Sequence, residues 1–160
     1  MTRIALVLVA LLLAAGCGSD EEAAPAEPGT TTDALFERAA VEIETGEETV
    51  RVPVEVAETA SQRELGLMHR RELAGDAGMV FLFDDDQTSG FWMKNTLIPL
   101  SIAFYDAEGR IVRILDMEPC REDPCPSYEP GAAYRGALEV NKGAFRRWGV
   151  EAGDRLTVVR

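Results

Sequence analysis

The stretch GFWMKNTLIPLSIAF, residues 90–104, places Trp92, Lys94 and Asn95 inside an otherwise apolar run. An indole offers a flat apolar face, and a neighbouring ammonium and amide can direct a polar ligand. We therefore predict a ligand site at these three residues, suited to a sugar, a peptide or an anionic small molecule. The structural alternative is that Lys94 extends to solvent from an edge strand or closes an ion pair, while Asn95 forms a turn.

Alternation along a predicted strand places Trp92 and Lys94 on one face and Asn95 on the other. Asn95 then joins the other two only if the chain bends before Pro99. A lysine within an apolar strand must reach solvent, meet a carboxylate or change its pKa. Two acids on predicted neighbouring strands are candidate partners for Lys94, namely Asp116 and Glu139.

The remaining chemistry-bearing residues exclude several classes of enzyme. His69 is the one histidine of the chain, and it lies near the end of a predicted helix, beside Arg70 and Arg71, as a surface residue would. Triads that hold a histidine against a nucleophile, and histidine-rich metal sites, are therefore not expected. The run Asp84–Asp86 lacks the spacing of a calcium loop and is better explained as a solvated loop at a strand end. We expect no metal and no cofactor.

Cys120 and Cys125 lie on a proline-containing segment, MEPCREDPCPSY. Four residues separate them, whereas redox motifs favour two at the start of a helix, and two thiols without a histidine make a poor zinc site. In an oxidising compartment they are expected to form a structural disulfide, contributing about 2 kcal/mol by closing a short loop.

The N-terminal residues 1–16 have the pattern of a secretory signal, with Arg3 followed by an apolar run too short to span a bilayer. Leu13 to Cys17, LAAGC, resembles the lipobox of bacterial lipoproteins, although Ala14 stands where a leucine is commoner. The resemblance implies lipidation of Cys17 and an exported protein that is anchored in a membrane and faces the extracytoplasmic or periplasmic side. The alternative is an ordinary cleaved signal.

Residues 17–33 follow as an acidic segment without large apolar residues, which predicts a disordered tether that holds the domain away from the membrane. Most of the net charge of −12 lies before residue 49. Residues 49–160 carry 18 acidic and 14 basic residues, so the folded part is mildly acidic. Nucleic acid is an unexpected partner for such a surface.

Residues 34–160 are expected to form a single β-rich domain. Two strands within 41–56 should pair around a turn, with Pro53 indicating an edge or bulged strand. A capping-box pattern at Thr59 predicts a helix over 59–71, and Asn141 can cap a second helix over 142–148. Further strands are predicted at 79–83, 91–95, 100–106, 111–117, 133–140 and 155–160. Short connections favour an antiparallel sandwich or barrel-like fold with about two short helices.

Several motifs together resemble the DUF192 family, a domain of unknown function. They are the segments 64–68 (ELGLM) followed by Arg70, 78–79 (GM), 91–100 (FWMKNTLIPL), 123–128 (DPCPSY), 138–141 (LEVN) and 153–154 (GD). The resemblance implies a small β-rich domain, often exported or lipid-anchored, without an established activity. Relatives commonly carry an aspartate where this chain has Ser101, so a mechanism based on that carboxylate does not carry over.

These features predict a lipid-anchored extracytoplasmic domain that acts as a non-enzymatic binding or accessory module of the cell envelope. Its partners would be the membrane, through Cys17, and an unknown small molecule, glycan or envelope protein. One alternative is an envelope hydrolase or transferase acting on glycan or peptide, using Lys94 with Asp116 or Ser101. Another is a structural partner domain without a ligand pocket, with a sizeable exposed apolar patch.

Overall fold

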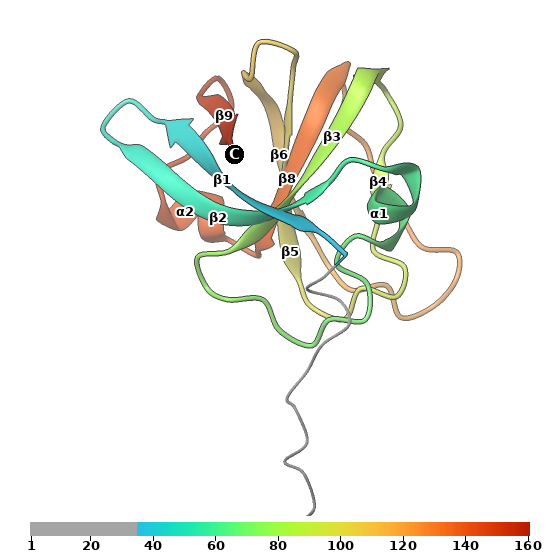
Figure 1. Cartoon of the computed structure of the whole chain (residues 1–160). Coiled ribbons are helices and arrows are strands. Elements are labelled where there is room, and N and C mark those ends of the chain that lie inside the picture. Colours follow the sequence, from blue (N-terminus) through green and yellow to red (C-terminus); the bar gives the residue numbers. More distant parts are fainter. Residues whose placement is uncertain (1–34) are drawn as a thin grey trace, which may run out of the picture.

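The computed structural model describes residues 35–160, and the predicted signal, Cys17 and the predicted tether lie outside them. The described part is built mainly from β-strands, with two short helices, as predicted (Figure 1). The elements in chain order are β1 (Glu37–Glu44), β2 (Thr49–Ala57), α1 (Ala60–Leu65), β3 (Gly78–Gln87), β4 (Phe91–Trp92), β5 (Leu100–Tyr105), β6 (Ile111–Met117), β7 (Ser127–Tyr128), β8 (Tyr134–Asn141), α2 (Ala144–Arg147) and β9 (Arg155–Val159). Neither helix in this part of the chain is long and apolar enough to cross a membrane.

Seven strands form one sheet in the order β6-β5-β8-β3-β2-β1-β9, and β4 pairs with β7 in a separate small sheet. The large sheet is mixed rather than purely antiparallel, because β2 and β3 run parallel. A parallel pair needs a long crossover, which α1 and the following loop supply. An isolated bridge between Arg110 and Arg155 brings the two ends of the sheet together at one point, but the sheet does not close into a barrel.

Pro53 lies in a central strand whose register with β1 is unbroken, which corrects the prediction of an edge or bulged strand. It pairs with Ala40 of β1, while the ladder between β2 and β3 begins only at Val54. At Pro53 itself, β2 has no paired strand on the side that β3 occupies from Val54 onward. The missing backbone N–H of proline is therefore tolerated in a strand that has neighbours on both sides further along.

The sheet buries an apolar cluster on each face. On β5, Ala103 and Tyr105 belong to the first cluster, whereas Ile102 and Phe104 belong to the second. The first cluster includes Phe145 of α2. The second cluster is covered by connecting segments and by residues at and just after the end of α1, among them Leu65 and Leu67. The candidate site lies on this side of the sheet.

Helix α1 begins as predicted but is shorter. Thr59 accepts a hydrogen bond from the backbone N–H of Gln62, and the Gln62 side chain accepts from the N–H of Thr59, completing the capping box. The helix ends at Leu65 because Gly66 adopts a positive φ of 46°. Met68 therefore lies in a turn and not on the helix.

Two other local predictions are corrected. Asp84–Asp86 continue β3 with exposed side chains and do not form a loop after it. Asn141 does not cap α2, whose N-cap is Gly143. The side-chain amide of Asn141 instead donates to the carbonyl oxygens of Leu73 and Ala74, at 3.0 and 2.9 Å, and fixes the end of the loop before β3.

Candidate functional site

The segment around Lys94 is a turn and not a strand. β4 ends at Trp92, Asn95 has a positive φ of 57°, and the N–H of Thr96 donates to the carbonyl of Met93 at 3.1 Å. The strand predicted over 91–95 is therefore wrong beyond Trp92, and the bend before Pro99 that Asn95 needs to join Trp92 and Lys94 is present. Because the chain turns here, all three side chains line one open hollow of about 490 Å³ between this turn and α1. We call it the outer hollow.

Two short contacts join the walls of this hollow. The N–H of His69 donates to the carbonyl of Asn95 at 2.8 Å, and the Asn95 amide lies 3.9 Å from the sulfur of Met68. His69 and Asn95 are also the two non-glycine residues with positive φ among residues 35–160. The backbone hydrogen bond between His69 and Asn95 thus joins the turn after α1 to the turn after β4 at two residues whose backbone conformations are uncommon outside glycine.

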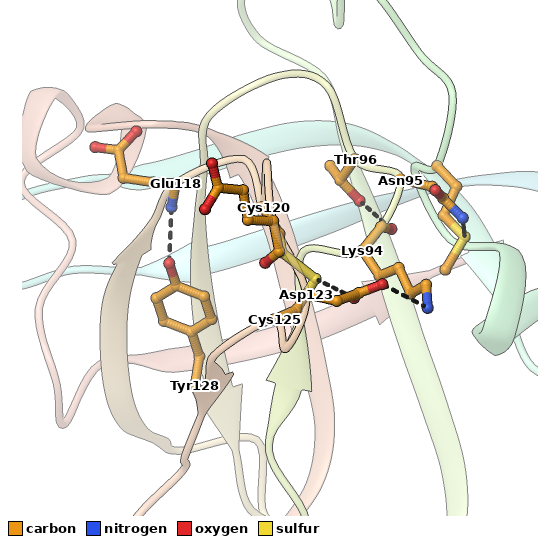
Figure 2. The surroundings of a disulfide bond; sticks show 10 residues. Lys94, Asn95, Thr96, Glu118, Cys120, Asp123, Cys125 and Tyr128 are labelled. Carbon is orange, nitrogen blue, oxygen red and sulfur yellow. Dashed lines mark hydrogen bonds and ion pairs between the residues drawn. A yellow bond between two sulfur atoms is a disulfide. The ribbon is translucent and has the colours of Figure 1, made fainter.

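Lys94 pairs with neither Asp116 nor Glu139. Its ammonium lies 3.6 Å from the Asp123 carboxylate (Figure 2). It also lies 5.9 Å from the centre of the Trp92 ring. The Lys94 side chain remains 43% exposed. The ion pair is therefore solvated, and the ammonium stays accessible to a ligand in the outer hollow.

Asp123 belongs to a segment that a disulfide closes. Cys120 and Cys125 are bonded as predicted, with sulfur atoms 2.08 Å apart (Figure 2). Just after it, β7 pairs with β4, so that Phe91 lies opposite Tyr128. The disulfide segment thus supports the strand that carries Trp92 and supplies the counter-ion of Lys94.

An inner pocket of about 160 Å³ adjoins the outer hollow, and Glu64, Leu65, Met68 and Trp92 line both. Glu139 of β8 also lines it. Glu139 pairs with Met79 and Ile102 on the flanking strands, both members of the second core cluster, so its side chain lies on that face of the sheet.

Glu139 is 5% exposed, and no hydrogen bond or ion pair to its side chain is present within residues 35–160. Burial raises the pKa of its carboxyl to about 8, so the group is mostly protonated at neutral pH. The sequence suggested Glu139 only as a partner for Lys94 and missed it as a site residue. The available signal was an acid inside the apolar strand segment ALEV, because burying a carboxyl costs free energy unless it has a partner.

Ser101 and Asp116 lie apart from the outer hollow and the inner pocket, and they line a different hollow with Arg146. The Ser101 hydroxyl donates to Asp116 and accepts the N–H of Gly143 at 2.8 Å. The hydrogen bond from Ser101, together with the Arg146 guanidinium, lowers the pKa of Asp116. The structure does not bring Lys94 together with either residue, so the catalytic pairings suggested by the sequence are not assembled.

A further hollow of about 460 Å³ opens beside Pro53. Its partly buried Arg70 forms an ion pair with Glu55 and stacks over Phe36. The guanidinium is therefore neutralised by the protein itself. Within residues 35–160 no group of three His, Cys, Asp or Glu side chains could hold a metal ion.

Fold and site together define a small β-rich domain with a cleft between α1 and the turn after β4. The cleft consists of the outer hollow and the inner pocket. The chain belongs to the DUF192 family, described as an uncharacterized ACR, which it matches over residues 41–158. The resemblance found in the sequence motifs is thereby confirmed. None of the curated proteins matches the chain.

Two solved structures share the fold. One is a protein described as a "putative transcription regulator" from Sinorhizobium meliloti 1021, with 35% sequence identity and a TM-score of 0.71 over 77% of this chain and 95% of that one. The other is a protein of unknown function from Novosphingobium aromaticivorans DSM 12444, with 28% identity and a TM-score of 0.73 over 83% of this chain and 94% of that one.

Proposed function

We propose that this protein is a lipid-anchored extracytoplasmic binding module of the cell envelope, and that its ligand enters the cleft between α1 and the turn after β4. One observation carries the proposal. Trp92, Lys94 and Asn95 line a single open hollow that adjoins a pocket lined by the buried Glu139.

The exposure of Trp92 supports a binding role. Its side chain is 53% exposed, whereas Phe91 beside it packs edge-on against Phe81 and Phe104 in the second core cluster. An indole that contributes little to the core but forms a wall of a hollow is suited to contact a partner molecule. The structural alternative, a domain without a pocket, does not account for this arrangement.

The anchor part of the proposal rests on the N-terminal sequence, and the export that it requires is also supported by the disulfide. The segment LAAGC ending at Cys17 resembles a lipobox, and the acidic residues that follow suit a solvated spacer. A disulfide in the folded domain is typical of an oxidising compartment outside the cytoplasm.

We do not extend the description of the Sinorhizobium protein to nucleic-acid binding by this chain. Residues 49–160 carry 18 acidic against 14 basic side chains, whereas nucleic-acid contacts need a basic surface. The two helices of the described part have six and four residues. Neither has the length of a helix that reads a DNA groove.

The cleft can be tested with n-butylammonium, 1-butanol and butyrate, which share a butyl or propyl chain and differ in charge. Trp148 is the second tryptophan, so a Trp148→Phe background leaves Trp92 as the sole indole emitter. We expect at least one of the three solutes to change the Trp92 emission in a saturable way. No saturable change with any of them at millimolar concentration would contradict the proposal.

A matched pair of lysine variants controls this titration. Lys94 and Lys142 are the two lysines of the chain; their side chains are 43% and 37% exposed, and each forms an ion pair. Lys94→Ala should alter the affinity of the solute, because its ammonium lines the outer hollow. Lys142→Ala removes an equivalent ion pair elsewhere and should leave the affinity unchanged.

A further inference from the structure

Glu139 lies on a central strand, and no group within residues 35–160 forms a hydrogen bond or ion pair with its carboxyl. A buried carboxyl without a partner destabilises a fold, and an apolar residue of similar size would pack there at lower cost. The carboxyl also lines a pocket that adjoins the open outer hollow. A ligand that entered this pocket could supply the missing partner and so offset the cost of burying the carboxyl.

The walls of the inner pocket are aromatic, with Phe81, Phe83, Phe91 and Trp92 around it. The faces of such rings carry negative potential and attract cations. Two of them already hold a cation of the protein: the Arg63 guanidinium lies 4.8 Å from the centre of the Phe83 ring, and the Lys94 ammonium 5.9 Å from that of Trp92. The environment thus suits positive charge.

The other charged groups at the pocket leave this preference in place. Arg63 and Glu64 reach it from α1 and have opposite charges. Arg63 donates to the carbonyl oxygens of Glu58 and Leu82 and forms no ion pair with Glu139. The strands flanking Glu139 present Met79 and Ile102, which do not titrate, and the turn after β4 contributes the buried Thr96 hydroxyl. At the outer hollow, Asp123 balances Lys94.

We propose that the inner pocket binds an organic ammonium group, with the Glu139 carboxylate as its counter-ion and the aromatic walls around it. This inference rests on the proposed binding function and narrows the ligand class to small amines or quaternary ammonium compounds. An anionic small molecule, which the sequence also suggested, would need Glu139 to stay protonated, so its binding should weaken as the pH rises through the pKa of that carboxyl.

Binding must then release a proton. Glu139 has a pKa of about 8 without ligand, so near neutral pH the carboxyl gives up its proton to the buffer when the cation arrives. The ionised fraction rises roughly tenfold between about pH 7 and pH 9, and the apparent affinity for a permanent cation should rise by a similar factor. A neutral ligand that used the protonated carboxyl as a donor would show the opposite trend.

Calorimetric titration of the full-length protein with n-butylammonium and with choline tests this inference, with 1-butanol and 3,3-dimethyl-1-butanol as their neutral counterparts. Measurement in two buffers of different ionisation enthalpy gives the number of protons released. We expect close to one proton per bound cation near pH 7, roughly tenfold tighter binding near pH 9, and weaker binding of the neutral counterparts.

Glu139→Gln should abolish proton release and weaken cation binding, whereas Glu151→Gln, on an exposed loop, should change neither. The proton count of the unmodified protein stands independently of whether any variant folds. Binding of the alcohols or butyrate without binding of the cations would overturn the ammonium inference and leave the proposed binding function intact. No response to any solute would overturn both, and cation binding without proton release would overturn the role of Glu139.

Discussion

Glu139 shows how the surroundings of one residue set both its chemistry and its effect on stability. Because burial raises the pKa of its carboxyl from 4.5 to about 8, the folded state holds a proton that the unfolded state has released between those values. The free energy of unfolding should therefore fall as the pH rises through this window. The fall attributable to Glu139 is roughly 5 kcal/mol, and it is complete above about pH 8.

Glu139→Gln removes this titration. We expect urea unfolding to give similar stabilities for variant and parent near pH 5 and a variant that is more stable by several kcal/mol near pH 9. Glu151→Gln, a substitution at an exposed position, should have the same free energy of unfolding as the parent at both pH values. If the parent and Glu139→Gln lost stability in parallel over this range, the carboxyl would not be buried as described.

At the same scale, sequence reasoning found part of the site. Trp92, Lys94 and Asn95 were selected by residue type, and the structure brings them together, although for a different reason from alternation along a strand. The acid within ALEV was visible in the sequence, but its place at the pocket was not, because a register between strands distant in sequence decides which face it occupies. Asp123, the actual partner of Lys94, lies on a loop whose path no local pattern specifies.

Among the elements, α1 forms one wall of the cleft and depends on its cap. Thr59→Ala removes the hydroxyl that accepts the N–H of Gln62 and should reduce the free energy of unfolding by about 1 kcal/mol. Thr59→Ser keeps the hydroxyl and should retain most of that stability. Chemical denaturation measures both, and equal losses in the two variants would show that the cap does not stabilise α1.

The disulfide segment forms the support on the other side of Trp92. Replacing Cys120 and Cys125 together by serine should lower stability by about 2 kcal/mol, because the unfolded chain regains the freedom of the opened loop. Since β7 pairs with β4, amide exchange at Phe91 and Trp92 should also quicken, while exchange in β1 should change little. Unchanged exchange at β4 would mean that the disulfide does not support the cleft.

Local signals predicted the elements better than their arrangement. The Thr59 capping box and the hairpin of β1 and β2 follow from neighbouring residues, and both were found. The end of α1 at Leu65 depends on the conformation of Gly66, which the helical pattern did not reveal. The parallel pairing of β2 with β3, which also leaves Pro53 beside an unpaired edge, depends on long-range topology.

For the whole molecule, the proposed anchor predicts a simple change of location. Cys17→Ser should remove the site of acylation and shift the protein from the membrane fraction to the soluble exported fraction. Mass spectrometry of the parent protein should detect acyl chains on Cys17 as its N-terminal residue. An unmodified parent protein, or a variant that stays membrane-bound, would contradict lipid anchoring while leaving the cleft untouched.

Ligand binding in the cleft between α1 and the turn after β4 can be located on the molecule by two-dimensional amide NMR spectra recorded during titration with n-butylammonium. We expect saturable shifts concentrated at Gly66, the Trp92 indole N–H and Thr96, which surround the inner pocket. Shifts confined to the hollow beside Pro53 and Arg70, or no shifts at all, would contradict binding in this cleft.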